Sequence, residues 1–262
     1  MVRYLIVGML LVLTAPSAWP YQPLKDDING GNPKLAKTTY RVFVGKEPDG
    51  SGFRQEAVNA LNQWRTALAA RGVTLDIQAG EPPNDPVDLK KYKLEIDRFN
   101  KDPIQDPANY PEMAKVDAKQ NTLSVYFRSS ADIQKMGAGS EKGWANSLWN
   151  LDTNGKAGVI EESDIFIPTD PPGGTADIKK QMIYNITLHE GGHAAGAGHY
   201  TTKQVKDGGQ VMQLDATLFT EKLILGAQET KLLDSIYGPP PQIKVTPNVH
   251  QEASSSLPAA LQ

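Results

Sequence analysis

Cysteine is absent from this 262-residue sequence. Without thiols the chain can form no disulfide, no thiolate metal site and no thiol nucleophile. Histidine is scarce, with four residues in the whole chain, so any imidazole chemistry must be concentrated at a few positions. The net charge is only −3, and acidic and basic residues are interspersed. This charge balance argues against nucleic acid and anionic membrane surfaces as partners.

Long apolar runs are also lacking, apart from one near the N-terminus. Arg3 precedes an apolar stretch from Tyr4 to Leu13, and small residues follow at Ala15, Ser17 and Ala18. The stretch is shorter than the roughly 20 residues that span a bilayer. It is typical of a secretory signal peptide, here assigned to residues 1–18, with an uncleaved anchor as the alternative. We therefore expect a secreted or periplasmic protein with no stable membrane insertion after cleavage.

The remaining sequence divides into a linker, one folded domain and a tail. Residues 19–37 are rich in Pro, Gly and Asn and predict a linker. Residues 38–238 contain strand and helix patterns and predict the domain. Residues 239–262, with PPPQ and SSSLP, predict a disordered tail. Apolar residues make up 39% of the chain, which is enough for a buried core.

Alternating strand and helix patterns predict an α+β fold. Strands are expected at 40–44, 73–77, 122–129 and 158–167, and helices from 53, from about 176, and at 220–237. In the first helix, Ser51 is the expected cap, Gly72 the expected end, and apolar residues recur every three or four positions. The first strand–helix–strand unit favours a parallel pair. The stretch 79–118 predicts a long irregular insertion with one short strand near 93–96.

Three of the four histidines lie in HEGGHAAGAGHY, residues 189 to 200. Residues four apart on a helix project from the same face one turn apart, so His189 and His193 can reach one metal ion. His199 would lie on the wrong face of a continuing helix. Gly196 can adopt the left-handed conformation that ends a helix and turns the chain back, which would return His199 as a third ligand.

Three histidines and one open position are typical of a catalytic zinc site rather than a closed structural one. Zinc lowers the pKa of a bound water towards about 7. Glu190 lies about 100° around the helix from His189, beside the metal rather than on it. It is the expected general base, taking the proton of the attacking water and passing it to the leaving amine.

The pattern HExxHxxGxxH resembles the extended zinc motif of the metzincin metalloproteases, and the chain matches it at His189, Glu190, His193, Gly196 and His199. The segment GGQVMQL, which contains Met212, resembles the methionine turn that metzincins place under the metal. YNITLHEGGHAAGAGHY and the final SIYG are most similar to the matrixin branch. The resemblance implies a zincin fold: a twisted mixed β-sheet, a long active-site helix, an upper subdomain at 38–197 and a lower one at 198–238.

Other signals carry alternatives. NLDTNGKAGVIE, residues 150–161, imitates a calcium loop, although a plain turn is favoured and Ca²⁺ remains open as a second ion. The sequon at Asn185 lies on the active-site helix, where a glycan has no room. Tyr184 and Tyr200 are interpreted as packing residues rather than oxyanion donors. Trp144 and Trp149 are placed in a glycine-rich loop.

These observations predict an exported zinc endopeptidase that hydrolyses peptide bonds of protein or peptide substrates. Peptides are expected to bind extended along an edge strand, for which the stretch Ser163 to Ile167 is the candidate. The alternatives are an exported, non-catalytic module that binds zinc for structure or recognition, and a calcium-regulated adhesion or matrix protein.

Overall fold

The computed structural model describes residues 31–78, 80–82, 88–116, 121–136, 143–213 and 221–241. The expected signal peptide, the first part of the expected linker and most of the expected tail lie outside these residues. Among the described residues, helices long and apolar enough to cross a bilayer are absent.

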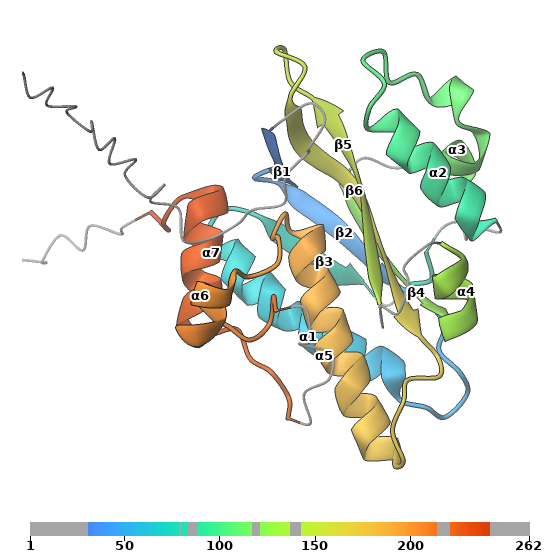
Figure 1. Ribbon diagram of the computed structural model, residues 1–262, viewed down its shortest axis with the longest axis vertical. Helices are drawn as coiled ribbons and strands as arrows, with labels where there is room; N and C mark the ends of the chain where they lie inside the picture. Colours follow the sequence, from blue (N-terminus) through green and yellow to red (C-terminus); the bar gives the residue numbers. More distant parts are fainter. Residues whose placement is uncertain are drawn as a thin grey trace, which may run out of the picture.

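One mixed sheet organises the described part of the chain, with strand order β1-β6-β4-β2-β3 and β5 on the other side of β6 (Figure 1). Strands β1, β6, β4, β2 and β3 run parallel to their neighbours, and β5 runs antiparallel to β6. The expected parallel pairing of the first two predicted strands is confirmed. The strands are β1 Gly31–Leu35, β2 Thr39–Val44, β3 Thr74–Gln78, β4 Thr122–Arg128, β5 Trp144–Leu151 and β6 Ala157–Pro168.

Helices α1 (Phe53–Ala69) and α5 (Ala176–Ala194) pack together on one face of the sheet (Figure 1). The predicted apolar positions of α1, Phe53, Ala57, Leu61, Trp64 and Leu68, are all buried. The expected cap differs by one residue. Gly52 is the N-cap and has no side chain to offer, so the Ser51 hydroxyl accepts from Phe53 N at 3.3 Å instead.

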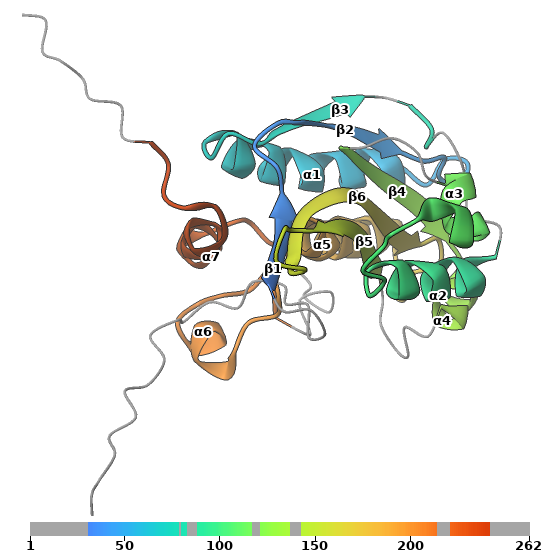
Figure 2. The same cartoon turned by 90° about the horizontal axis from the view of Figure 1, so that it is seen from above.

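The prediction of an irregular insertion at 79–118 is wrong over much of its length. It forms helix α2 (Leu89–Phe99), a 3-10 turn (Pro107–Asn109) and helix α3 (Pro111–Val116), and no strand at 93–96. Leu89, Tyr92, Ile96 and Phe99 recur every three or four residues and are buried. With α4 (Ser130–Lys135), they form a second apolar cluster against Tyr126 and Phe166 of the sheet. Figure 2 shows α2, α3 and α4 grouped on one side of the molecule.

Three other boundaries are corrected. The expected linker contains β1, which the sequence could not reveal because its partner β6 lies far along the chain. The expected glycine-rich loop with Trp144 and Trp149 is strand β5. The last helix, α7, spans Ala227–Tyr237 rather than beginning at 220, and backbone atoms of the segment before it bond to side chains of α1 and α5.

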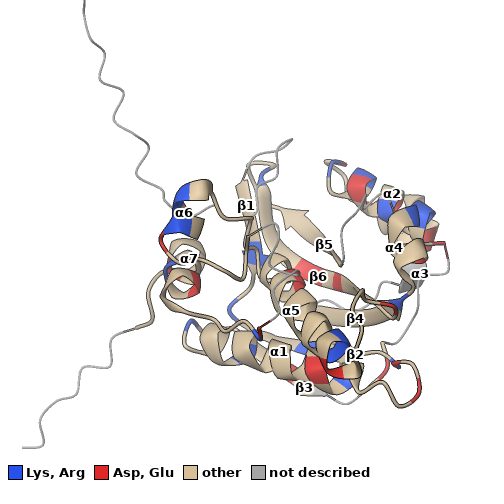
Figure 3. Cartoon of the chain, turned by 60° about the horizontal axis from the view of Figure 1, so that its bottom comes forward, with Lys and Arg blue, Asp and Glu red and all other residues tan. Residues whose placement is uncertain are grey.

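The chain after α5 forms a smaller unit with α6 (Thr202–Lys206) and α7. A capping box between Thr201 and Gln204 starts α6. Basic and acidic side chains are dispersed over the helices, while acidic residues also mark β6 (Figure 3). The described fold is a mixed α/β structure with a largely parallel sheet, compatible with the predicted α+β class.

Candidate metal centre

Helix α5 supplies two of the three clustered histidines. It begins where predicted, with the Thr175 side chain accepting from Ile178 N at 3.3 Å. Its second half is buried almost all round, because α1 packs beside it and β5 and β6 pack against it from the sheet. His189 is therefore 4% exposed although it is a polar residue, and a buried polar ring requires partners.

The bend that ends α5 brings in the third histidine. Gly196 has φ +87°, the left-handed value predicted for it. Ala197 N donates to Gly192 O and Gly196 N to His193 O, each at 2.9 Å, which is the Schellman pattern. A Cβ at Gly196 would lie 2.5 Å from the Pro33 carbonyl oxygen of β1, so glycine is required here by both conformation and space.

The Nε2 atoms of the three histidines converge. His193 Nε2 lies 3.2 Å from His189 Nε2 and 3.2 Å from His199 Nε2, and the remaining pair is 3.3 Å apart. An ion with tetrahedral geometry and metal–nitrogen bonds of about 2.0–2.1 Å separates its ligand nitrogens by about 3.3–3.4 Å. Within the described chain, these three residues are close enough to bind a metal ion.

The other ring nitrogens fix the tautomer of two histidines. His189 Nδ1 lies 2.7 Å from Val211 O, and His193 Nδ1 lies 2.8 Å from Ala197 O. A carbonyl only accepts, so each Nδ1 carries the proton and each Nε2 presents a lone pair. Burial lowers the pKa of His189 to about 4 and lowers that of His193 well below its ordinary value. Burial also lowers the pKa of His199, so all three rings favour the neutral form that ligates metals.

Glu190 is buried beside the cluster, with 6% exposure. A Cβ added at Gly143 would lie 2.9 Å from Glu190 Oε1 and would overlap the side chain of Ile186. Gly143 immediately precedes β5, so the carboxylate lies against the beginning of that strand. The absence of a side chain at Gly143 leaves the room that the carboxylate occupies.

The two glycines between His189 and His193 allow close packing beneath the cluster. A Cβ at Gly191 would lie 2.9 Å from Trp64 Cδ1, and one at Gly192 would overlap Met212 Sδ. Trp64 Nε1 also donates to Leu188 O at 2.7 Å. Met212 is fully buried in a turn in which Gln213 N approaches Gln210 O at 3.4 Å. The predicted methionine turn therefore lies against the helix that carries the histidines.

A buried carboxylate on α7, which the sequence did not reveal, holds this turn. Glu229 Oε1 accepts from Tyr200 OH at 2.7 Å and from Val211 N at 3.3 Å, while Oε2 accepts from Gly226 N at 2.8 Å. Val211 O in turn accepts from His189 Nδ1. Tyr200 is thus a packing residue that bonds to α7, in agreement with its interpretation from the sequence. The only local signal was a glutamate three residues after Gly226, typical of a helix start.

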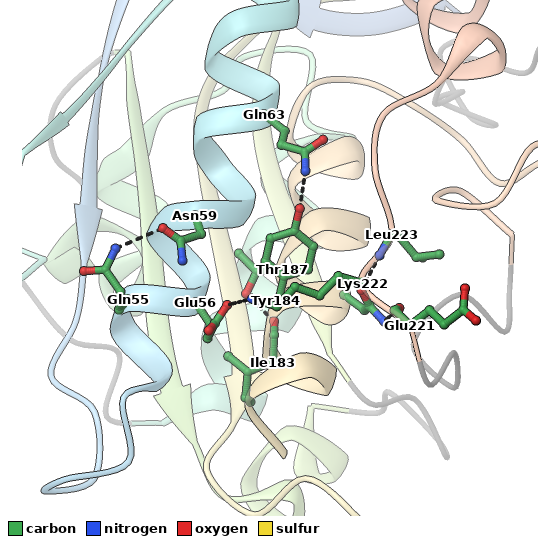
Figure 4. A network of polar contacts seen from close by, with 11 residues as sticks. Gln55, Glu56, Asn59, Gln63, Ile183, Tyr184, Thr187, Glu221, Lys222 and Leu223 are labelled. Atoms are coloured by element: carbon green, nitrogen blue, oxygen red, sulfur yellow. Dashed lines mark hydrogen bonds and ion pairs between the residues drawn. The ribbon is translucent and has the colours of Figure 1, made fainter. Parts of the chain in front are cut away.

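Asn185 and Tyr184 tie α5 to its neighbours. Asn185 is fully buried; its Nδ2 donates to Glu221 O at 2.9 Å and its Oδ1 accepts from Leu223 N at 3.0 Å, which leaves no room for a glycan. Tyr184 OH bonds to Gln63 of α1, and Lys222 Nζ lies 2.6 Å from Glu56 Oε2 (Figure 4). The contact with α1 agrees with the interpretation of Tyr184 as a packing residue.

The predicted peptide-binding edge is wrong. Residues Ser163 to Ile167 of β6 pair with β4, and β5 covers their other side as far as Phe166. The edge strand on this side of the sheet is β5. Within 150–161, the β5–β6 connection at 152–156 is a turn, in which Asp152 Oδ1 accepts from Asn154 N at 2.8 Å and from Lys156 N at 2.9 Å.

Comparison with known proteins adds no assignment. No protein-family model matches the chain, and no curated protein is significantly similar to it in sequence.

Proposed function

We propose that this chain is an exported zinc endopeptidase of the metzincin type. The observation that carries the proposal is the convergence of three neutral imidazoles, that of His189 buried, on one point through their Nε2 lone pairs. Nitrogen lone pairs that point at one another over 3.2–3.3 Å repel each other unless a cation lies between them. Imidazole nitrogens are ligands that zinc prefers, and three of them leave a position for substrate chemistry.

The residues around the cluster support peptide hydrolysis. A bound zinc ion would supply Lewis acidity, lowering the pKa of a coordinated water and polarising a peptide carbonyl. Glu190 would accept the proton of the attacking water and deliver it to the leaving amine nitrogen. The carbonyls of Val211 and Ala197 would keep His189 and His193 in the ligating tautomer. The position of Glu190 beside the start of β5 supports binding of an extended peptide along that strand.

The proposal is tested by metal content and casein hydrolysis of the purified protein. We expect about one zinc per chain, cleavage that a chelator abolishes, and recovery when zinc is returned. Glu190→Ala should retain zinc and lose activity by about 10²–10⁴-fold, the range for a general base. Glu221→Ala is the matched control, because its side chain is exposed and its backbone oxygen makes the contact with Asn185.

Two results decide against the proposal. A protein that never takes up zinc would remove the metal centre itself. Zinc bound at the three histidines with no hydrolysis of casein or gelatin would favour the non-catalytic binding module instead.

A further inference from the structure

Two side-chain amides occupy the outer edge of β5 along its second half. Asn100 Nδ2 donates to Ser147 O at 3.0 Å, and Asn100 Oδ1 accepts from Trp149 N at 3.3 Å. Gln105 Nε2 donates to Trp149 O at 2.9 Å, and Gln105 Oε1 accepts from Leu151 N at 3.1 Å. We call these two side chains the amide cap.

The amide cap substitutes for a neighbouring strand. Each amide offers β5 one donor and one acceptor, as a peptide group does. Each therefore pairs with one carbonyl and one N–H of β5. Exposed strand edges otherwise recruit further chains. A peptide cannot pair with β5 between Ser147 O and Leu151 N while the amide cap is in place.

The amide cap is held rigidly. Asn100 directly follows α2, is 6% exposed, and donates its backbone N–H to Ile96 O at 2.9 Å. Helix α2 is fixed to the sheet by its buried apolar face and by Tyr92 OH, which donates to Asp164. Gln105 has φ +50°, a left-handed conformation that is unfavourable for a non-glycine residue. This strained backbone is the one that directs its amide to Trp149 and Leu151.

The first half of the β5 edge differs. In an antiparallel pair, N–H and C=O groups of alternate residues face the same side, so those of Ala145 face outward with those of Ser147 and Trp149. Among the described residues, no hydrogen bond reaches the outward N–H or C=O of Ala145. This half begins at Gly143, beside the carboxylate of Glu190.

We propose that the amide cap of Asn100 and Gln105 limits the substrate-binding edge of β5 to the stretch from Gly143 to Asn146, and so sets how much peptide the enzyme recognises. The inference rests on the proposed function and gives the inserted segment containing α2 a role in specificity. Asn100 and Gln105 are positioning residues, because they act on the length of the strand pairing and contact no reacting atom.

The direction of the peptide follows from the direction of β5. Antiparallel strand pairs outnumber parallel ones, so the peptide is expected to run opposite to β5. Its N-terminal residues then lie towards Leu151, and the bond to be cleaved lies near Glu190. One peptide residue lies opposite each strand residue, so about four residues on the N-terminal side of the cleaved bond are held. Residues further from it extend past the amide cap into solvent.

Peptide length tests the proposal in hydrolysis. A cleavage site mapped in casein is made as fluorogenic peptides with two to eight residues before the cleaved bond. In the wild-type protein, kcat/KM should rise up to about four residues and then stay level. In the double variant Asn100→Ala, Gln105→Ala it should continue to rise, by about two- to tenfold per added hydrogen-bonded pair. Gln134→Ala, an exposed glutamine on α4, is the control, and Gln105→Ala alone serves if the double variant does not fold.

Hydrogen exchange gives a readout that does not need turnover. With Glu190→Ala protein and the same peptides, the Ala145 amide should become protected, while Trp149 and Leu151 are protected before the peptide is added and do not change. Protection at Ala145 without hydrolysis by the wild-type protein would refute the proposed function and leave only the limit on peptide pairing along β5 standing. A wild-type preference that keeps rising beyond about four residues, or no protection at Ala145 with any peptide, would overturn it.

Discussion

Gly192 illustrates how one missing side chain permits the packing under the histidines. It lies inside α5, where glycine costs about 1 kcal/mol relative to alanine, yet a Cβ there would overlap Met212 Sδ and lie 3.0 Å from Trp64. We predict that Gly192→Ala lowers the free energy of unfolding by about 1–3 kcal/mol, the usual cost of overpacking. Urea denaturation measures this. Gly174→Ala, with no atom near its Cβ, should change little; equal effects would contradict the prediction.

Gly196 combines two requirements that can be separated experimentally. Its φ is +87° and its Cβ would meet the Pro33 carbonyl, whereas Gly208 has φ +94° and open space around it. We predict that Gly196→Ala destabilises the protein more than Gly208→Ala by about 1–3 kcal/mol, and that it alone weakens zinc binding, because His199 follows the bend. Equilibrium unfolding and zinc titration distinguish the two variants. Unchanged zinc affinity in Gly196→Ala would remove the assigned role of the bend.

Helix α7 acts on the histidines from a distance through Glu229. Loss of its carboxylate removes this acceptor from the buried Tyr200 hydroxyl and from Val211 N–H. We predict that Glu229→Ala costs about 1–3 kcal/mol of stability for each donor left unsatisfied, and that it weakens zinc binding, because Val211 also holds His189 Nδ1. Calorimetric unfolding and zinc titration test this against Lys231→Ala, an exposed position on the same helix. Zinc affinity equal to that of the control would contradict the coupling.

The contact between α2 and β6 predicts a pH dependence. Burial raises the pKa of Asp164 to about 7, while the unfolded chain retains the ordinary value near 3.9. The folded state then binds the proton more tightly, so this group lowers stability progressively as pH rises from about 4 to about 7. Asp164→Asn should remove that loss, and its advantage over wild type in urea denaturation should grow across this range. A difference that does not vary with pH would contradict the prediction.

Elements defined by local sequence were predicted, and elements defined by distant partners were not. The spacing of His189, His193 and Gly196 acts within one helix and its end, so the site could be read directly. Strand β1 was missed because its pairing with β6 depends on residues far away in sequence. Helix α2 was missed because dense Pro, Asp and Lys around it outweighed the regular spacing of Leu89, Tyr92, Ile96 and Phe99. Glu229 gave no sign of its burial because its partners lie on another segment.

At the scale of the whole molecule, metal binding should be coupled to folding. Zinc needs the three rings together, and only the folded chain brings them together, so the ion stabilises the native state by mass action. We predict that zinc at about 100 times its dissociation constant adds about 2.7 kcal/mol, seen as a higher melting temperature that a chelator reverses. His193→Ala should melt at the same temperature with and without zinc. A zinc-dependent shift that persists in this variant would place the ion elsewhere.

The hydroxyl of Tyr237 joins the two ends of the described chain behind the bend of α5. It accepts from Leu35 N at 3.2 Å, across 202 positions of sequence, and donates to Ala195 O at 2.6 Å. Contacts of such high sequence separation form late and slow folding. A nascent chain that has emerged as far as His199 therefore carries all three clustered histidines but lacks Tyr237, which braces their arrangement. The order of synthesis itself delays the finished cluster until Tyr237 has been made.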